Sequence, residues 1–574
     1  MPARPRPSGK LRPVLALIIV LVLVAAAAVY ILVLRPAKGI TIGDIGHAQK
    51  LLALDFPRSE RKMMEENLGN DRAAYEANRK TALPNDVSPA LAFSPILPGM
   101  VFDLQRKPFP PLRDKGLNAP ANIEDLAFAP VADLAELIRN RKITSMALTR
   151  MYLDRLKKYG PKLHCVITLT EDLALRQAAR ADAEIAAGRY RGPLHGIPWG
   201  AKDLLATKGI PTTWGAAPYR DQVPAEDAAV VKRLDEAGAV LAAKLSMGEL
   251  AMDDVWFGGM TRNPWNPEQG SSGSSAGSAA AAAGGLVGFA VGTETWGSII
   301  SPCTRCGASG LRPTFGRVSR TGAMALCWSM DKIGPICRTA EDCALVFQVL
   351  LGPDGRDQTV VELPFNWDPD LDPRTLRVGY FQSAFDKEAA SKDEKGKAAR
   401  QNDLRVLDTL RSMGVALVPF EMPDFPSDSL AFILDAEAAA AFDELTRSGR
   451  DRLLARQGPE DWPNLFRAAR LISAVEYIQA NRLRRLLMER MAEKMKAVDV
   501  FVTPSYARDL LLVTNLTGHP AVVVPDGFNE DGRPTSISFI GNLFGEAQVL
   551  RLAQAYQSAT EFHLKHPKWM QSGH

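Results

Sequence analysis

The alternation of apolar and polar segments predicts an α/β fold over most of the chain. From about residue 124 onwards, short apolar runs typical of buried strands alternate with segments of helical periodicity. One such helix ends at Gly238 and leads directly into the apolar run 239–243. Repetition of strand, helix and strand predicts a sheet with parallel pairs and with helices on its faces. We therefore expect residues 124–567 to form one large α/β domain.

A second apolar pattern lies at the N-terminus. Residues 13–34 carry no charge and are long enough to cross a bilayer. The tail 1–12 is basic, which predicts that it stays in the cytoplasm and that the body of the protein is exported. The alternative is a cleaved signal peptide with its site at 25–28. Because an apolar signal region is usually about 7–15 residues, the continuation of this run favours an uncleaved, single-pass transmembrane signal anchor.

The residues between the anchor and the α/β domain form an accessory segment, 35–123. Its first part, to about residue 80, has a helical pattern, whereas residues 81–122 contain eight prolines. Such punctuation predicts an extended, irregular connection. The pattern leaves open whether this connection is a tether or a strap across the main domain. At the other end of the chain we expect a short C-terminal tail, 568–574.

Composition narrows the classes of function. A net charge of +4 without a basic stripe argues against a nucleic-acid partner. Six cysteines in 574 residues do not form a disulfide scaffold, so buried thiols are favoured, with disulfides in an exported protein as the alternative. Cys303 and Cys306 form a lone Cys-x-x-Cys without the second pair that zinc requires. We expect neither a metal nor a cofactor.

The candidate chemistry begins with a Gly/Ser-rich run, 270–278, that continues into a helix-forming alanine run. A flexible linker is the simpler interpretation, but the run lies between patterned segments. A Gly/Ser loop at a helix start gathers backbone N–H groups and hydroxyls, as a buried polar site requires. The apolar strand 286–291 then ends at the turn 292–298. Ser298 on this turn is a candidate nucleophile.

A serine nucleophile requires a base. None of the seven histidines lies in a triad motif, and His195 is interpreted as structural. A buried lysine that desolvation keeps neutral is the alternative base, and Lys202 stands at the end of a short apolar run. A lone lysine is usually solvated, so Lys202 depends on the other segments for support. Lys244, which ends another apolar strand, is interpreted as structural.

Together these segments resemble the amidase signature family. The resemblance rests on Gly192–Pro198 with Lys202 and Asp203, on the Gly/Ser-rich run, on the turn before Ser298, and on the 24-residue step from Ser274 to Ser298. It covers roughly residues 124–560. It implies a single α/β/α domain around a mixed, twisted sheet, which is the amidase signature fold.

The resemblance also implies roles. Ser298 would attack the amide carbonyl and form an acyl-enzyme. Ser274, held through a cis peptide bond, would pass protons between Ser298 and the base Lys202. The oxyanion hole would consist of backbone N–H groups of Thr295, Trp296, Gly297 and Ser298.

The sequence departs from the family pattern in three places. Glu294 replaces an aspartate, Trp296 replaces a glycine, and Ile300 replaces an arginine. If the position of Trp296 required a positive φ, the side chain would be strained by roughly 1–2 kcal/mol. Without the arginine, which contacts anionic substrates in some members, we expect a more apolar or bulkier substrate.

We therefore predict an amidase that hydrolyses a carboxylic acid amide to an acid and an amine or ammonia. The alternatives are an ammonia-releasing A-type subunit of an amidotransferase and a catalytically inactive binding protein on the same fold. The predicted partners are a small-molecule or lipid amide substrate and the membrane, through the N-terminal helix. An oligomer is compatible with the sequence.

Overall fold

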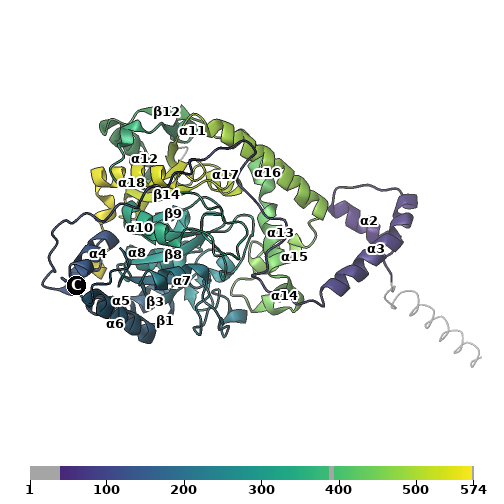
Figure 1. Ribbon diagram of the computed structural model, residues 1–574. Coiled ribbons are helices and arrows are strands. Elements are labelled where there is room, and N and C mark those ends of the chain that lie inside the picture. Colours follow the sequence, from purple (N-terminus) through teal and green to yellow (C-terminus); the bar gives the residue numbers. More distant parts are fainter. Residues whose placement is uncertain (1–38, 387–393, 572–574) are drawn as a thin grey trace, which may run out of the picture. The chain divides into compact units, whose positions relative to one another are not determined.

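The computed structural model describes residues 39–386 and 394–571, which divide into two units, Met1–Pro84 and Asn85–His574 (Figure 1). In the first unit, α2 (Ile42–Leu51) and α3 (Arg58–Asn78) form where the sequence predicts helices. The predicted transmembrane anchor, 13–34, lies outside the described residues. Within the described part, no helix is both long and apolar enough to cross a membrane.

The second unit is built around one mixed sheet. Among the described residues its eleven strands follow the order β1-β3-β2-β8-β10-β9-β14-β15-β13-β11-β12, and Figure 1 shows β8, β9 and β14 near the middle of the unit. The strands are β1 (Val166–Leu169), β2 (Pro198–Lys202), β3 (Val240–Leu245), β8 (Phe289–Glu294), β9 (Ser309–Arg312), β10 (Lys332–Cys337), β11 (Val378–Phe381), β12 (Leu417–Phe420), β13 (Val500–Pro504), β14 (Ala521–Phe528) and β15 (Pro534–Gly541).

Strand direction matters for the site. β2 runs parallel to both β3 and β8, with Ala201 opposite Val291 on β8. The other parallel pairs join β11 to β12 and to β13, whereas the remaining pairs of this sheet are antiparallel. Because β2 and β8 are parallel neighbours, their carboxyl ends meet at the same edge of the sheet.

Helices cover both faces of this sheet. Side chains of a strand alternate between two apolar cores, since Phe289 and Val291 belong to one and Ala290 to the other. This confirms the predicted large α/β domain with a mixed sheet. The helices of the second unit are α4 (Val131–Arg139), α5 (Ser145–Leu163), α6 (Glu171–Ala186), α7 (Ala229–Glu236), α8 (Ala276–Ala283), α9 (Ile300–Cys306), α10 (Ala340–Leu350), α11 (Gln382–Asp386), α12 (Glu394–Ser412), α13 (Phe432–Ala441), α14 (Asp443–Arg447), α15 (Trp462–Ala469), α16 (Ala474–Met495), α17 (Leu510–Thr517) and α18 (Glu546–Thr560).

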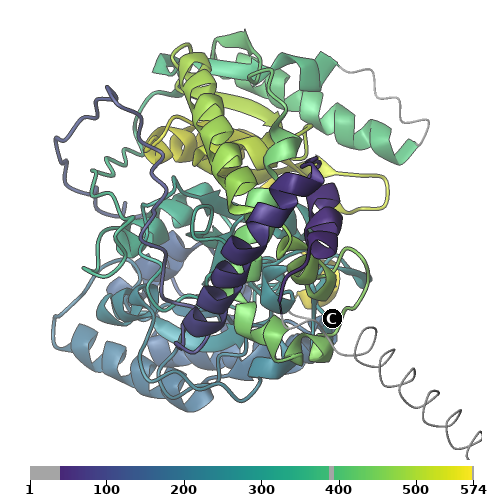
Figure 2. The ribbon, with the colours of Figure 1, turned by 90° about the vertical axis from the view of Figure 1, so that its right-hand side faces the viewer.

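The proline-rich connection is a strap on the second unit, which we call the catalytic unit because it carries the three predicted catalytic residues Lys202, Ser274 and Ser298. Residues 85–122 contain no helix or strand, and Figure 2 shows them as an extended dark trace along one side of the unit. The side chain of Asn85 donates to the carbonyl of Ala325 (2.9 Å) and accepts from its N–H (2.7 Å). Further along, the N–H groups of Lys115 and Leu117 donate to the carboxylate of Glu136. These contacts show that the connection is a strap on the domain and not a free tether.

The last described residues, up to 571, are also packed on the second unit. Met570 is buried, and its carbonyl accepts a hydrogen bond (2.8 Å) from the buried guanidinium of Arg155. The residues predicted as a C-terminal tail therefore include a packed segment.

Candidate active site

Three segments bring the predicted catalytic side chains together. Lys202 is the last residue of β2, and Ser298 lies in the turn between β8 and α9. Ser274 lies in the Gly/Ser-rich loop between β7 (Asn266–Gly270) and α8. The parallel pairing of β2 with β8 places Lys202 beside the start of the nucleophile turn, which we define as residues 293–298.

Lys202 is fully buried and is surrounded by hydroxyl groups. Its Nζ donates to Oγ of Ser274 (2.8 Å), to Oγ of Ser275 (3.1 Å) and to Oγ1 of Thr293 (2.9 Å). Among the described residues it has no carboxylate partner at ion-pair distance. Burial therefore dominates and lowers the pKa of Lys202 to about 7, against a smaller opposing effect of Asp331 and Glu294. A lysine in this state can accept a proton at neutral pH.

The Gly/Ser-rich loop is fastened to the nucleophile turn. The peptide bond between Gly273 and Ser274 is cis, as the resemblance implies. The N–H of Ser275 donates to the carbonyl of Ser298 (3.1 Å), and its hydroxyl donates to the carbonyl of Thr293 (3.0 Å). Within the described residues the hydroxyl of Ser298 has no hydrogen-bond partner. The link from Lys202 to Ser274 is thus present, whereas the link from Ser274 to Ser298 is not formed as a hydrogen bond.

The backbone of the nucleophile turn presents unpaired donors. In the part of the chain that the structure describes, the N–H groups of Thr295, Trp296, Gly297 and Ser298 donate to no protein acceptor. The left-handed position in this turn belongs to Gly297, with φ of +90°, whereas Trp296 does not have a positive φ. The strain considered for Trp296 is therefore absent. The four predicted N–H groups are available to an oxyanion.

The side chain of Glu294 holds the nucleophile turn in place through hydrogen bonds. One carboxylate oxygen accepts from the N–H groups of Ile299 (2.9 Å) and Ile300 (3.0 Å), directly after Ser298. The other accepts from Arg312 and from Asn515, both at 2.9 Å. Burial acts to raise the pKa of Glu294, but the guanidinium and these hydrogen bonds hold it below its usual value. Glu294 is therefore a buried carboxylate that orients the residues following the nucleophile.

Sequence reasoning missed several of these residues. Thr293 and Ser275 gave no signal of their own beyond membership of the motifs. Asn515 was not among the candidate residues of the sequence; it is fully buried in α17. Arg312, which donates to the same oxygen of Glu294, also had no predicted role.

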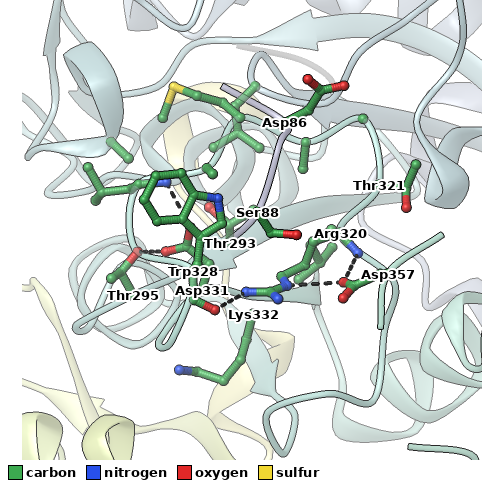
Figure 3. A pocket seen from close by; sticks show the side chains of 18 of the residues that line it. Asp86, Ser88, Thr293, Thr295, Arg320, Thr321, Trp328, Asp331, Lys332 and Asp357 are labelled. Carbon is green, nitrogen blue, oxygen red and sulfur yellow. Dashed lines mark hydrogen bonds and ion pairs between the residues drawn. The ribbon is translucent and has the colours of Figure 1, made fainter. Parts of the chain in front are cut away.

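A cavity of about 120 Å³ borders the turn on the side of Thr293 and Thr295 (Figure 3). Its wall includes Ser88 from the strap, which lies near the middle of the group drawn in Figure 3. Most polar groups of this wall are paired. Asp331 accepts from the hydroxyl of Thr295 (2.6 Å), and Arg320 forms an ion pair with Asp357 (3.1 Å). The strap thus forms part of the wall of a cavity beside the candidate site.

The two residues interpreted as structural have other partners. Lys244 forms a buried ion pair with Asp203 (2.9 Å) and donates to Thr212 (2.7 Å). His195 is buried between Arg191, whose N–H donates to Nδ1 (3.1 Å), and Glu184, which lies 3.2 Å from Nε2. Neither hydrogen-bonds to a serine of the candidate site.

The cysteines are buried free thiols, which the sequence favoured over disulfides. Burial raises the pKa of the Cys165 thiol to about 12, so it is an unreactive thiol at neutral pH. Within the described ranges no group of three or more His, Cys, Asp or Glu side chains is arranged to hold a metal ion.

Comparison with known proteins assigns the family. The family model described as Amidase matches residues 147–550. The chain belongs to the amidase signature family. The A-type subunit of a glutamyl-tRNA(Gln) amidotransferase from Methylococcus capsulatus is 34% identical over 491 residues, covering 76% of this chain and 98% of that protein.

Solved structures give the same result. The peptide amidase from Stenotrophomonas maltophilia superposes with a TM-score of 0.68 at 29% identity, covering 76% of this chain and 98% of that chain. An amidase family protein from Bacillus anthracis gives 0.68 at 26% identity, covering 78% and 93%. Membership of this family makes the chain an enzyme that acts on amide C–N bonds. About a quarter of the chain lies outside each of these matches.

Proposed function

We propose that this protein hydrolyses a carboxamide through an acyl-enzyme on Ser298, with Ser274 as the bridging residue and Lys202 as the base. The observation that carries the proposal is the environment of Lys202. Its amine is buried, donates to Ser274 at 2.8 Å, and has only hydroxyl partners among the described side chains. Because the pKa of Lys202 is lowered to about 7, a large fraction of the amine is neutral at physiological pH, and the neutral form can accept the proton of Ser274, as a general base requires.

The proposed reaction has two halves. Lys202 takes a proton from Ser274 while Ser274 takes one from Ser298, and Oγ of Ser298 bonds to the carbonyl carbon. The N–H groups of the nucleophile turn hold the resulting oxyanion. The C–N bond then breaks as the relay returns the proton to the leaving nitrogen. Water attacks the acyl-enzyme by the same proton path and releases the acid.

A fluorophosphonate tests the proposal, because it reacts with an activated serine and leaves an adduct that mass spectrometry locates. We expect one adduct, on Ser298, in the purified full-length protein. Lys202→Ala and Ser274→Ala should each label at least about 100-fold more slowly. Ser278→Ala is the matched control, since Ser278 lies in the same run but donates to a strand carbonyl (3.2 Å). A folded protein that gives no adduct on Ser298 would favour the inactive binding protein.

A second candidate is the ammonia-releasing subunit of an amidotransferase. It is favoured by the name and the 34% identity of the relative from Methylococcus capsulatus, which this chain matches over nearly its whole length. Both candidates use the same acyl-enzyme and differ in the fate of the ammonia. Copurification with further subunits and a strict preference for glutamine would support the second candidate. Turnover of several amides by the isolated chain would support the first.

The membrane location remains a prediction from the sequence. The apolar run 13–34 would tether the enzyme beside the bilayer and place the catalytic unit on the exported side. Fractionation of cells that express the full chain, followed by protease treatment of intact cells after opening of any outer barrier, tests both statements. Recovery in the soluble fraction with the N-terminus shortened would indicate a cleaved signal peptide instead.

A further inference from the structure

Trp296 differs from its neighbours in the nucleophile turn. Its side chain is 42% exposed, whereas Thr295 and Ser298 are 6% and 9% exposed. The backbone of Trp296 is ordinary, because the positive φ of this turn is taken by Gly297. The indole therefore projects from the turn without strain. A large aromatic surface left in water two residues from the nucleophile calls for a partner.

That surface is one wall of a pocket of about 390 Å³. Tyr506 and Leu511 line it together with Trp296. The ring of Tyr506 is 53% exposed and is held in place because its hydroxyl donates to the carbonyl of Ser301 (3.2 Å), in α9. Leu511 lies on α17, which Figure 1 labels. The pocket is thus lined by two aromatic rings, Trp296 and Tyr506, and by the aliphatic side chain of Leu511.

The pocket reaches the catalytic turn. A Cβ atom built on Gly297 would lie 3.1 Å from Cδ1 of Leu511, which is tighter than ordinary van der Waals contact. The pocket wall therefore touches the residue that directly precedes Ser298. Trp296 and Gly297 thus connect the pocket to Ser298 along the chain.

The charges at this pocket select against anions. Asp428 and Asp509 both line it. Asp509 accepts a hydrogen bond from the hydroxyl of Ser427, whereas the side chain of Asp428 has no hydrogen bond or ion pair among the described residues. Arg508 also lines the pocket, and its guanidinium lies over the ring of Phe381, 5.8 Å from the centroid, with no ion pair among the described residues. The lining side chains therefore carry two carboxylates against one guanidinium, and this excess of negative charge disfavours a carboxylate-bearing group.

We propose that this pocket binds a neutral or cationic aromatic group of the amide substrate, stacked on Trp296 and Tyr506. This inference rests on the proposed function, since it places the ring by its connection to the amide that Ser298 attacks. The pocket then determines specificity. Aromatic amides gain contact with two rings and Leu511, small aliphatic amides leave the pocket to water, and carboxylate-bearing amides are repelled.

Substrate pairs that differ only in the ring test this. Hydrocinnamamide and hexanamide carry the ring or an alkyl chain on the acyl side, N-benzylacetamide and N-hexylacetamide carry them on nitrogen, and 4-carboxyhydrocinnamamide adds the anion. The full-length protein is compared with Trp296→Gly, Trp296→Phe and Tyr506→Ala. Tyr75→Ala is the matched control, because Tyr75 is an aromatic residue of similar exposure (55%) in α3.

In one of the two pairs, Tyr506→Ala should raise KM for the aromatic member roughly tenfold and leave the alkyl member within about twofold, and Trp296→Gly should lower the preference for the aromatic over the alkyl member by a similar factor. Trp296→Phe should keep most of the preference, and Tyr75→Ala should change nothing. The wild type should turn over 4-carboxyhydrocinnamamide least. Equal effects of both variants on aromatic and alkyl amides, or no effect, would overturn the inference.

Labelling of Ser298 distinguishes failure of the proposed function from failure of the proposed aromatic pocket. An ethyl fluorophosphonate is too small to fill the pocket, so it should label Ser298 at the same rate in wild type and in Tyr506→Ala. If the wild type is not labelled, the proposed function itself fails. If labelling is intact and the aromatic preference does not depend on Trp296 or Tyr506, only the assignment of the pocket fails.

Discussion

Two buried lysines on neighbouring strands show how a partner decides the role of a charged group. Lys202 ends β2, and Lys244 lies on β3, which runs parallel to it with Lys244 opposite Ala201. Both side chains are fully buried. Lys244 faces the carboxylate of Asp203 at 2.9 Å, whereas Lys202 donates to the hydroxyls of Ser274, Ser275 and Thr293.

The two lysines differ in the interactions that oppose the effect of burial on their pKa. Burial lowers the pKa of both lysines, but Asp203 works against that effect at Lys244 through its charge and its hydrogen bond. Asp203 follows Lys202 directly in sequence and still serves the other lysine. A buried lysine with its own carboxylate is held as a charged ion pair that the fold cannot lose on one side without cost, and one among hydroxyls is available as a base.

The largest expected effect comes from Lys202→Met, which removes the amine and keeps an unbranched apolar chain. We expect kcat/KM to fall by about 10² to 10⁴, as for loss of a general base. The fold should persist, because no buried carboxylate loses its ion-pair partner. Steady-state kinetics and circular dichroism check both parts. A variant that retains more than about a tenth of the activity would exclude Lys202 as the base.

Lys244→Met should do the opposite. It leaves Asp203 as an uncompensated buried charge, which lowers the free energy of unfolding by about 3–5 kcal/mol. Activity per folded molecule should stay close to that of the wild type, since Lys244 has no contact with the serines. Urea denaturation measures the stability, and fluorophosphonate titration counts the active molecules. Unchanged stability together with lost activity would reverse the roles assigned to the two lysines.

A smaller effect on activity is expected at Glu294, whose carboxylate pairs with Arg312 and not with Lys202. Glu294→Gln keeps the shape but removes the charge that pairs with Arg312, so stability should fall by about 1–3 kcal/mol. The nearby negative charge also raises the pKa of Lys202, and its loss should move the acidic limb of the pH–rate profile to lower pH. Glu294→Asp is the control that keeps the charge. A profile shifted to higher pH would contradict the arrangement.

The sequence allowed part of this to be predicted. Hydrophobic periodicity located the strands and helices of the catalytic unit, because burial on one or both faces leaves a pattern in each element. The boundaries were less exact, since the predicted strand 286–291 forms at Phe289–Glu294 after the turn at Gly285 (φ +62°). Ser298 and Lys202 were candidates from their own segments, but only the resemblance joined them with Ser274 into one site.

The contacts between segments could not be predicted. Asp203 pairs with Lys244 because successive side chains of a strand point to opposite faces and because β2 pairs with β3 in this register. Neither the alternation nor the register can be deduced from the composition of the chain. Thr293 and Ser275 become significant only once β2 and β8 are neighbours. The prolines of the strap showed that it is irregular. Its contact with the domain could not be predicted, because Asn85 bonds to Ala325, which lies 240 positions away in the chain.

The most direct test of the account is the pH dependence of fluorophosphonate labelling at Ser298, which isolates activation of the serine from substrate binding and product release. Lys202 must be neutral to accept a proton, and its pKa is lowered to about 7. The labelling rate should therefore be low in acid, rise through about pH 7, and level off above it. A rate that stays flat from about pH 5 to 9, or that rises only near the ordinary lysine pKa of about 10.4, would contradict a neutral Lys202 as the base.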